Sequence, residues 1–145
     1  MKSNLIVIDT NVFISSIIGQ LGYPRRIFDE LVLTNEIQIC LSETVLLEYY
    51  EVANRERFKK YKDFNKKANE LIEAIKLKAI WFSPKEEIDI LPDKDDNKFI
   101  ELAVEANANY IVTGNTNDFI ITEFRGIKIY TPKQFYEEWI KNEID

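Results

Sequence analysis

The sequence contains no histidine and a single cysteine, Cys40, among its 145 residues. Without imidazole there can be no Ser-His-Asp triad, no Cys-His pair and no zinc site of the usual His/Cys kind. One cysteine excludes an intramolecular disulfide and fits a reducing cytosol. Any catalysis must therefore rest on carboxylates, lysines, tyrosines or hydroxyls.

Long apolar runs are missing as well, since none approaches the roughly 18–20 residues that span a bilayer. The apolar stretch Leu5–Ile8 is too short for the core of a signal peptide, which needs about 7–15 residues. The four glycines form no phosphate-binding loop, which argues against nucleotide-binding enzymes. We therefore expect a cytoplasmic protein that does not contact membranes.

What is present is an ordinary globular balance of 46% hydrophobic and 30% charged residues. This length and composition predict one domain, residues 1–145. With 19 basic and 25 acidic residues the net charge is -6, so a basic surface over the whole molecule is excluded and only a local basic patch remains available.

Short apolar runs alternate with helical patterns along the whole chain. This alternation predicts an α/β fold, a three-layer α/β/α sandwich around a central, mainly parallel sheet of about five strands. The expected strands are residues 5–8, 37–41, 79–82, 110–113 and 127–130. The expected helices begin near Val12 and span about 24–33, 42–54, 57–78, 96–104 and 132–141.

Ligands of open α/β sheets bind beyond the carboxyl ends of the strands, so polar residues that follow strands are site candidates. Asp9 ends a run of four aliphatic residues, where a carboxylate is costly unless something compensates it. Its structural alternative is an N-cap for the next helix. Glu48 lies in a mostly apolar helical stretch, and its alternative is a position facing solvent.

Two further acidic segments lie near strand ends. Asp93, Asp95 and Asp96 crowd one short segment, whose alternative role is a solvated loop and helix cap. Asp118 follows the fourth strand and can also be an ordinary turn residue. Carboxylates that converge repel each other unless a cation is present, and oxygen-only ligands favour Mg²⁺ or Mn²⁺. The residues therefore indicate metal-dependent phosphoryl chemistry.

Four segments in order resemble the motifs of PIN-domain ribonucleases, in particular the VapC-like toxins of type II toxin–antitoxin systems. They are Ile6–Val12, Leu41–Tyr49, Asp95–Ala103 and Ile111–Phe119, and they extend over nearly the whole chain. Each motif alone is weak, but their order and spacing together are a strong signal.

The resemblance implies a Mg²⁺- or Mn²⁺-dependent endoribonuclease that cleaves single-stranded RNA with a metal-activated water. It implies that Asp9, Glu48, Asp96 and Asp118 are catalytic and hold the metal. Many relatives carry aspartate where this chain has Asn115, whereas others carry asparagine there and the acid three places later, as at Asp118. Further implications are a cognate antitoxin, a homodimer, and products with a 5′ phosphate and a 3′ hydroxyl.

The resemblance also implies substrate-side roles for polar neighbours of these acids. Asn11 and Thr113 would orient the acids, Asn115 would contact substrate, and Ser42 would cap a helix or contact substrate. Ordinary turn and cap roles are the alternative for each of them.

Segment 55–67 is a local basic patch that could bind RNA even though the protein as a whole is acidic. It carries seven basic and two acidic residues, a local charge of +5, whereas segment 86–105 carries two basic and eight acidic residues, a charge of -6. Phe58, Tyr61 and Phe64 are interleaved and either stack on bases or face the core. The basic residues expected to bind substrate are Arg55, Arg57, Lys59 and Lys60.

Other functions fit the sequence less well. An aspartyl-nucleophile phosphatase needs a second aspartate two residues after the first, and Asn11 stands there. A phosphoacceptor signalling domain needs an acidic pair near the first strand and a lysine after the last. A PIN nuclease of RNA processing and a non-catalytic RNA-binding protein stay open as alternatives.

Overall fold

The computed structural model describes residues 4–114 and 121–144, which form a six-stranded sheet in the order β3-β2-β1-β4-β6-β5. All neighbouring strands are parallel except β5 and β6. The central strand β1 is fully buried from Ile6 onward, as its continuous aliphatic sequence predicts. The strands are β1 Leu5–Ile8, β2 Gln38–Leu41, β3 Ile80–Trp81, β4 Tyr110–Val112, β5 Glu123–Phe124 and β6 Ile127–Tyr130.

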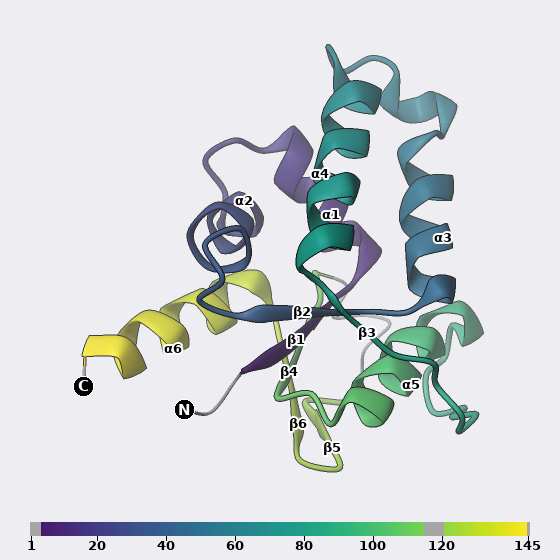
Figure 1. The fold of residues 1–145 in the computed structure, drawn as a ribbon, viewed down its shortest axis with the longest axis vertical. Helices are drawn as coiled ribbons and strands as arrows, with labels where there is room; N and C mark the ends of the chain where they lie inside the picture. Colours follow the sequence, from purple (N-terminus) through teal and green to yellow (C-terminus); the bar gives the residue numbers. More distant parts are fainter. Residues whose placement is uncertain (1–3, 115–120, 145) are drawn as a thin grey trace.

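Helices cover both sides of the sheet, which confirms the three-layer α/β prediction. Figure 1 shows α1 to α4 on one side and α5 on the other, while α6 contacts α2 and β6. A π-helical stretch, Ile27–Val32, continues α2 directly. The helices are α1 Thr10–Ile18, α2 Tyr23–Arg26, α3 Glu43–Ala53, α4 Phe64–Lys78, α5 Asn97–Ala106 and α6 Pro132–Ile144.

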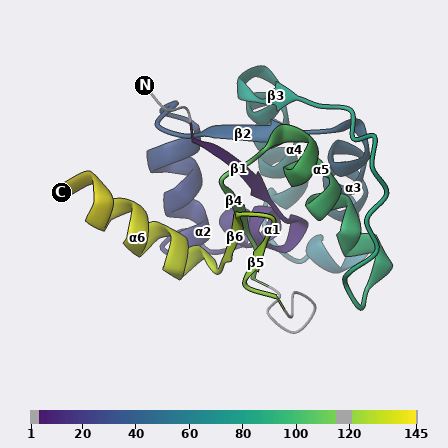
Figure 2. The same cartoon turned by 90° about the horizontal axis from the view of Figure 1, so that it is seen from below.

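The strand order reverses between β1 and β4. After β1 the chain proceeds to β2, and after β4 it proceeds to β5 and β6 on the opposite side. The backbone N–H of Asp9 donates to the carbonyl of Val112 at 3.0 Å, which joins the carboxyl ends of the two strands. Helices α3 and α5 contact each other, and Figure 2 shows them at the same end of the molecule. This switch point is where ligands bind in open α/β sheets.

Two expectations about local structure are wrong. The helix expected over 57–78 begins only at Phe64, because Asp63 adopts a left-handed backbone conformation with φ 58° and interrupts it. The preceding Glu56–Phe58 is a separate 3₁₀ turn. The sixth strand, β5, was not expected, and its hairpin with β6 turns through Arg125 and Gly126, both with positive φ.

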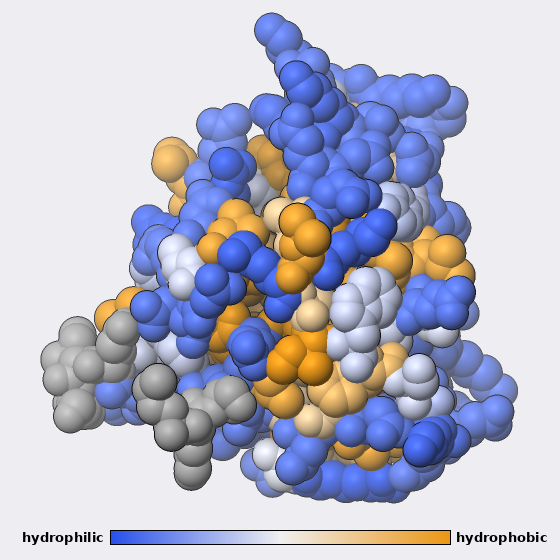
Figure 3. Space-filling model, viewed as in Figure 1, coloured by the Kyte–Doolittle hydropathy of each residue, from blue (hydrophilic) through white to orange (hydrophobic). Residues whose placement is uncertain are grey.

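The surface is uneven in polarity. Figure 3 shows apolar side chains gathered near the middle of one face, with hydrophilic residues over the upper helices. Leu77 at the end of α4 and Trp81 on the edge strand β3 are exposed. Within the described ranges, no helix is long and apolar enough to cross a membrane.

Candidate active site

Asp9 is buried at the end of β1, with 4% of its surface exposed. One carboxylate oxygen, Oδ1, accepts from the backbone N–H of Val12 at 3.0 Å and caps α1. The other, Oδ2, accepts from the hydroxyl of Thr113, which follows β4. Asp9 therefore caps α1, which is the structural role considered for it from the sequence, and it also lies at the switch point of the sheet.

Burial raises the pKa of Asp9 from 3.8 to about 6. The hydrogen bonds from Thr113, Val12 and the backbone of Asn11 lower this pKa, and the negative charge of Glu48 raises it further. Glu48 is also linked to this end of β1 by geometry, because it accepts a hydrogen bond from Thr10, the residue after Asp9. The repulsion between the two carboxylates is what a bound cation relieves.

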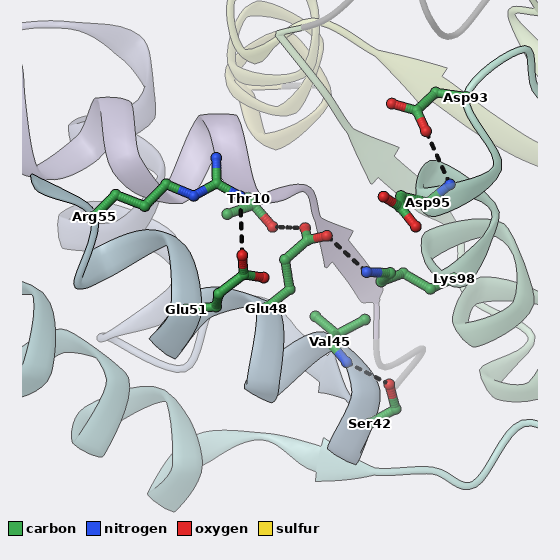
Figure 4. A network of polar contacts seen from close by, with 9 residues as sticks. All are labelled: Thr10, Ser42, Val45, Glu48, Glu51, Arg55, Asp93, Asp95 and Lys98. Carbon is green, nitrogen blue, oxygen red and sulfur yellow. Dashed lines mark hydrogen bonds and ion pairs between the residues drawn. The ribbon is translucent and has the colours of Figure 1, made fainter. Parts of the chain in front are cut away.

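Glu48 does not face open solvent, so the alternative that it occupies a solvent-facing helix position is wrong. Its side chain on α3 is 18% exposed and both of its carboxylate oxygens are engaged. Oε2 accepts from the hydroxyl of Thr10, and Oε1 pairs with the ammonium of Lys98 at 2.7 Å. Figure 4 shows Glu48 between these two partners. The side chains that meet here come from α1, α3 and α5.

The helix that carries Glu48 is fixed to the end of β1. Ser42 is buried and caps α3 by accepting from the N–H of Val45 at 3.2 Å, which is the capping role expected for it. The fully buried Tyr49 donates its hydroxyl to the carbonyl of Ile8 at 2.5 Å and stacks on Phe13 with ring centroids 4.7 Å apart. These contacts set the position of Glu48 relative to Asp9.

Asp96 stands at the N-cap position of α5 without a side-chain hydrogen bond that caps the helix, and α5 contacts β1, β2 and α3. Its side chain is half-buried and its Oδ2 atom is fully buried. Asp93 and Asp95 are both exposed, and Oδ1 of Asp93 accepts from the N–H of Asp95 at 3.0 Å (Figure 4). The acidic segment thus separates into an exposed turn and one half-buried acid at the helix end.

Two residues that follow Asp96 were not singled out from the sequence. The buried amide of Asn97 accepts from the N–H groups of Ile90 and Leu91 at 3.2 and 3.1 Å, which holds the acidic loop against α5. Lys98 reaches Glu48 across the site. The available signal was a lysine among eight acids in segment 86–105, at the first turn of a helix where cations are disfavoured.

Asn115 and Asp118, the candidates for the fourth position, lie outside the described residues. The described residue that precedes them, Gly114, is exposed directly after β4 and Thr113. The described ranges contain no group of three or more acidic side chains already gathered as a metal site. They do contain Asp9 and Glu48 joined to the same end of β1, with a lysine ammonium bound to Glu48. The donors that these two acids offer are carboxylate oxygens, the ligands that hard divalent ions such as Mg²⁺ prefer.

The basic segment divides into paired and pocket-lining residues. Arg55 pairs with Glu51 at 3.2 Å and Lys59 with Glu56 at 2.8 Å, while Lys60 lies over the ring of Tyr61 at 5.3 Å. Phe58 and Phe64 are buried and stack on each other at 4.9 Å, so these two rings take the core-facing alternative, whereas Tyr61 is exposed.

Arg57 resembles Lys60 in lying over an aromatic ring, that of Phe58 at 4.8 Å, but of the four candidates it is the one that lines a pocket of the described residues. It lines a pocket of about 390 Å³ together with Asn11 and Gly114, at the carboxyl end of the sheet. No acid of the described segments lies within ion-pair distance of its guanidinium. Arg57 thus lines a pocket beside Asn11, whereas Arg55 pairs with Glu51, one helical turn from Glu48 on α3.

A family model for the PIN domain matches residues 5–117. The chain belongs to the PIN domain family. This is a family of nucleases that generally use divalent metal ions. An uncharacterized protein, MJ1680, of Methanocaldococcus jannaschii is 31% identical over 144 residues, covering 94% of this chain and 92% of the relative.

Solved structures show the same fold at low sequence identity. A chain of the DNA-bound VapBC structure from Salmonella typhimurium has a TM-score of 0.58 and 16% identity, covering 89% of this chain and 98% of that chain. A chain of VapBC-1 from nontypeable Haemophilus influenzae has a TM-score of 0.56 and 14% identity, with the same two coverages. The PIN-like, VapC-like fold expected from the four motifs is thereby confirmed.

Proposed function

We propose that this PIN-domain protein is an endoribonuclease that cleaves single-stranded RNA with Mg²⁺ or Mn²⁺. The observation that carries the proposal is the position of Asp9 at the switch point of the sheet, with Glu48 bound to the neighbouring Thr10 and Asp96 at the start of α5, the helix that contacts α3. Because the chain has no histidine, hydrolysis at this site depends on carboxylates and a cation.

In this proposal Asp9, Glu48 and Asp96 hold the divalent cation, with Asp118 as the fourth acid. When bound, such a cation lowers the pKa of a coordinated water and stabilises the charge of a phosphoryl group in transfer. The hydroxyls of Thr113 and Thr10 donate to Asp9 and Glu48, so they orient the two carboxylates.

The first experiment measures cleavage of an unstructured RNA by the purified protein with Mn²⁺ or Mg²⁺. We expect cleavage with either ion and none in EDTA. The exposed Asp93 provides a control, since Asp93→Asn removes a nearby charge without touching the proposed ligands. Cleavage that persists in EDTA would contradict the metal-dependent reaction.

RNA is proposed to approach along the pocket that Arg57 lines, with its phosphates near the guanidinium. We expect Arg57→Ala to weaken the binding of a single-stranded RNA about tenfold and to lower the log–log salt slope by about one. Fluorescence anisotropy in the Asp9→Asn background measures binding without consuming the RNA. Lys59→Ala is the matched control, because Lys59 is paired with Glu56 and does not line the pocket. If both variants lose the same RNA affinity, Arg57 does not contact the RNA more directly than Lys59 does.

The toxin assignment is part of the same proposal, with a cognate antitoxin as partner, a homodimer as the active form and the cytoplasm as location. Its support is the VapC-like fold together with the four motifs. We expect expression of the chain alone to arrest bacterial growth and expression of Asp9→Asn to be harmless. Unimpaired growth at the same protein level, with cleavage retained in vitro, would favour a nuclease of RNA processing.

A further inference from the structure

The ion pair between Lys98 and Glu48 differs from the other ion pairs of the described residues. Its nitrogen and oxygen are 2.7 Å apart and its side chains are 20% and 18% exposed. In each of the other ion pairs in the described ranges both side chains are at least 36% exposed. Ion pairs at that exposure contribute little to stability, whereas loss of one partner from a shielded pair leaves a charge uncompensated.

The position of Lys98 in its helix makes this pair costly to build. Lys98 is the second residue of α5, where the positive end of the helix dipole disfavours a cation. The Glu48 carboxylate attracts the Lys98 ammonium and offsets the unfavourable effect of the helix dipole. Asp9 adds a second negative charge nearby, since Glu48 accepts a hydrogen bond from Thr10, the residue after Asp9.

Lys98 occupies the carboxylate oxygen of Glu48 that a divalent ion approaching from α5 would use. Oε2 of Glu48 accepts from the hydroxyl of Thr10, which leaves Oε1 and its lysine partner as the face toward α5. A hydroxyl tolerates a metal ion bound to the same carboxylate, but an ammonium in contact with the carboxylate repels it. The Lys98 ammonium therefore opposes binding of the ion at Oε1, and its movement away from Glu48 favours that binding.

The structure contains a place for the displaced ammonium. Lys98 also lines a pocket of about 490 Å³ beside α5, and four acidic side chains share that lining. They are Glu87, Asp89, Asp95 and Glu101. A rotation of the flexible lysine stem toward them exchanges one carboxylate partner for another.

We propose that Lys98 is a resident counter-cation of the metal site, which holds Glu48 in the metal-free protein and which a divalent ion displaces. The inference rests on the proposed function in one respect, namely that Glu48 is a ligand of the ion. Lys98 is a positioning residue in this scheme, because it acts on the site through Glu48.

The test is calorimetric titration of the full-length protein with Mn²⁺ in the absence of RNA. If Lys98 is engaged with Glu48 in about nine-tenths of the molecules, its removal tightens Mn²⁺ binding about tenfold. We expect this gain for Lys98→Met, and a smaller gain for Lys98→Gln, which keeps a neutral donor and serves if the methionine variant does not fold. Lys94→Met is the matched control, because it removes a cation from the same acidic segment that does not pair with Glu48.

Thermal unfolding gives an independent readout. In EDTA we expect Lys98→Met to melt at a lower temperature than wild type and Lys94→Met, and we expect Mn²⁺ to restore most of the loss. Equal Mn²⁺ affinities of wild type and the Lys98 variants, or an equal gain in Lys94→Met, would overturn the exchange. Absence of Mn²⁺ binding in every variant would overturn the metal site itself, whereas Mn²⁺ binding without RNA cleavage would count against the nuclease proposal alone.

Discussion

Asp9→Asn should lower the rate of Mn²⁺-dependent RNA cleavage by about 10³-fold while leaving the fold intact. The amide keeps an acceptor for the N–H of Val12, so the cap of α1 survives. The amide N–H of asparagine can also donate to the hydroxyl oxygen of Thr113, because a hydroxyl accepts hydrogen bonds as well as donating them. What the variant loses is one negative charge at the carboxyl end of β1, where the proposal places the divalent ion.

The same substitution should stabilise the metal-free protein at neutral pH. The folded-state pKa of Asp9 is about 6 and its ordinary value is 3.8, so the folded protein binds more protons than the unfolded chain between these pH values. The free energy of unfolding therefore falls as the pH rises from about 4 to about 6, by roughly 3 kcal/mol, and stays lower above that range. Asparagine carries no charge and avoids this loss.

Denaturant unfolding of both proteins in EDTA at pH 5 and pH 8 measures this effect. We expect Asp9→Asn to be more stable than wild type at pH 8, with a smaller advantage at pH 5. Added Mn²⁺ should stabilise wild type and not the variant, because the site has lost a ligand. An advantage that is the same at both pH values would show that the buried charge of Asp9 is not its cause.

The order of the elements could be predicted from the sequence because each central element has a strong local signal. The aliphatic run Leu5–Ile8 and the serine cap before α3 depend on neighbours within a few residues. The missed strand β5 has only two residues, and its hairpin depends on positive φ at Arg125 as well as Gly126. The helix expected over 57–78 is interrupted at Asp63, which is also a non-glycine residue with positive φ. The amino-acid composition does not reveal that backbone conformation.

The candidate site could be predicted only as far as the acids that follow strands. Asp9 and Glu48 stood out because they interrupt apolar patterns, and the fold brings both to the carboxyl end of β1, where Glu48 accepts from Thr10. Lys98 was missed because its partner lies 50 residues away, so the pairing arises from the contact between α3 and α5. Arg57 was one of four equivalent basic candidates until tertiary structure placed it beside Asn11.

Tyr49 should be the residue where a substitution in the core has the largest effect on both stability and activity. It is fully buried next to Glu48, stacks on Phe13, and binds the carbonyl of Ile8, the residue before Asp9. We expect Tyr49→Ala to lose about 4 kcal/mol of unfolding free energy, since it removes a large buried ring and leaves a cavity. Tyr49→Phe keeps the ring and should lose only about 1–2 kcal/mol.

Tyr49→Phe separates the two roles of this side chain. Because its hydroxyl joins α3 to the end of β1, its loss relaxes the spacing of Glu48 and Asp9 while the core stays filled. We expect RNA cleavage by Tyr49→Phe to fall about tenfold or more, even where unfolding curves show the protein fully folded, because small misplacements in a reactive site are costly. Phe135→Leu is the control, since Phe135 is buried in the same core but packs on Tyr110 and not at the end of β1. Full activity in Tyr49→Phe would show that the stacking on Phe13 alone holds the two acidic residues in place.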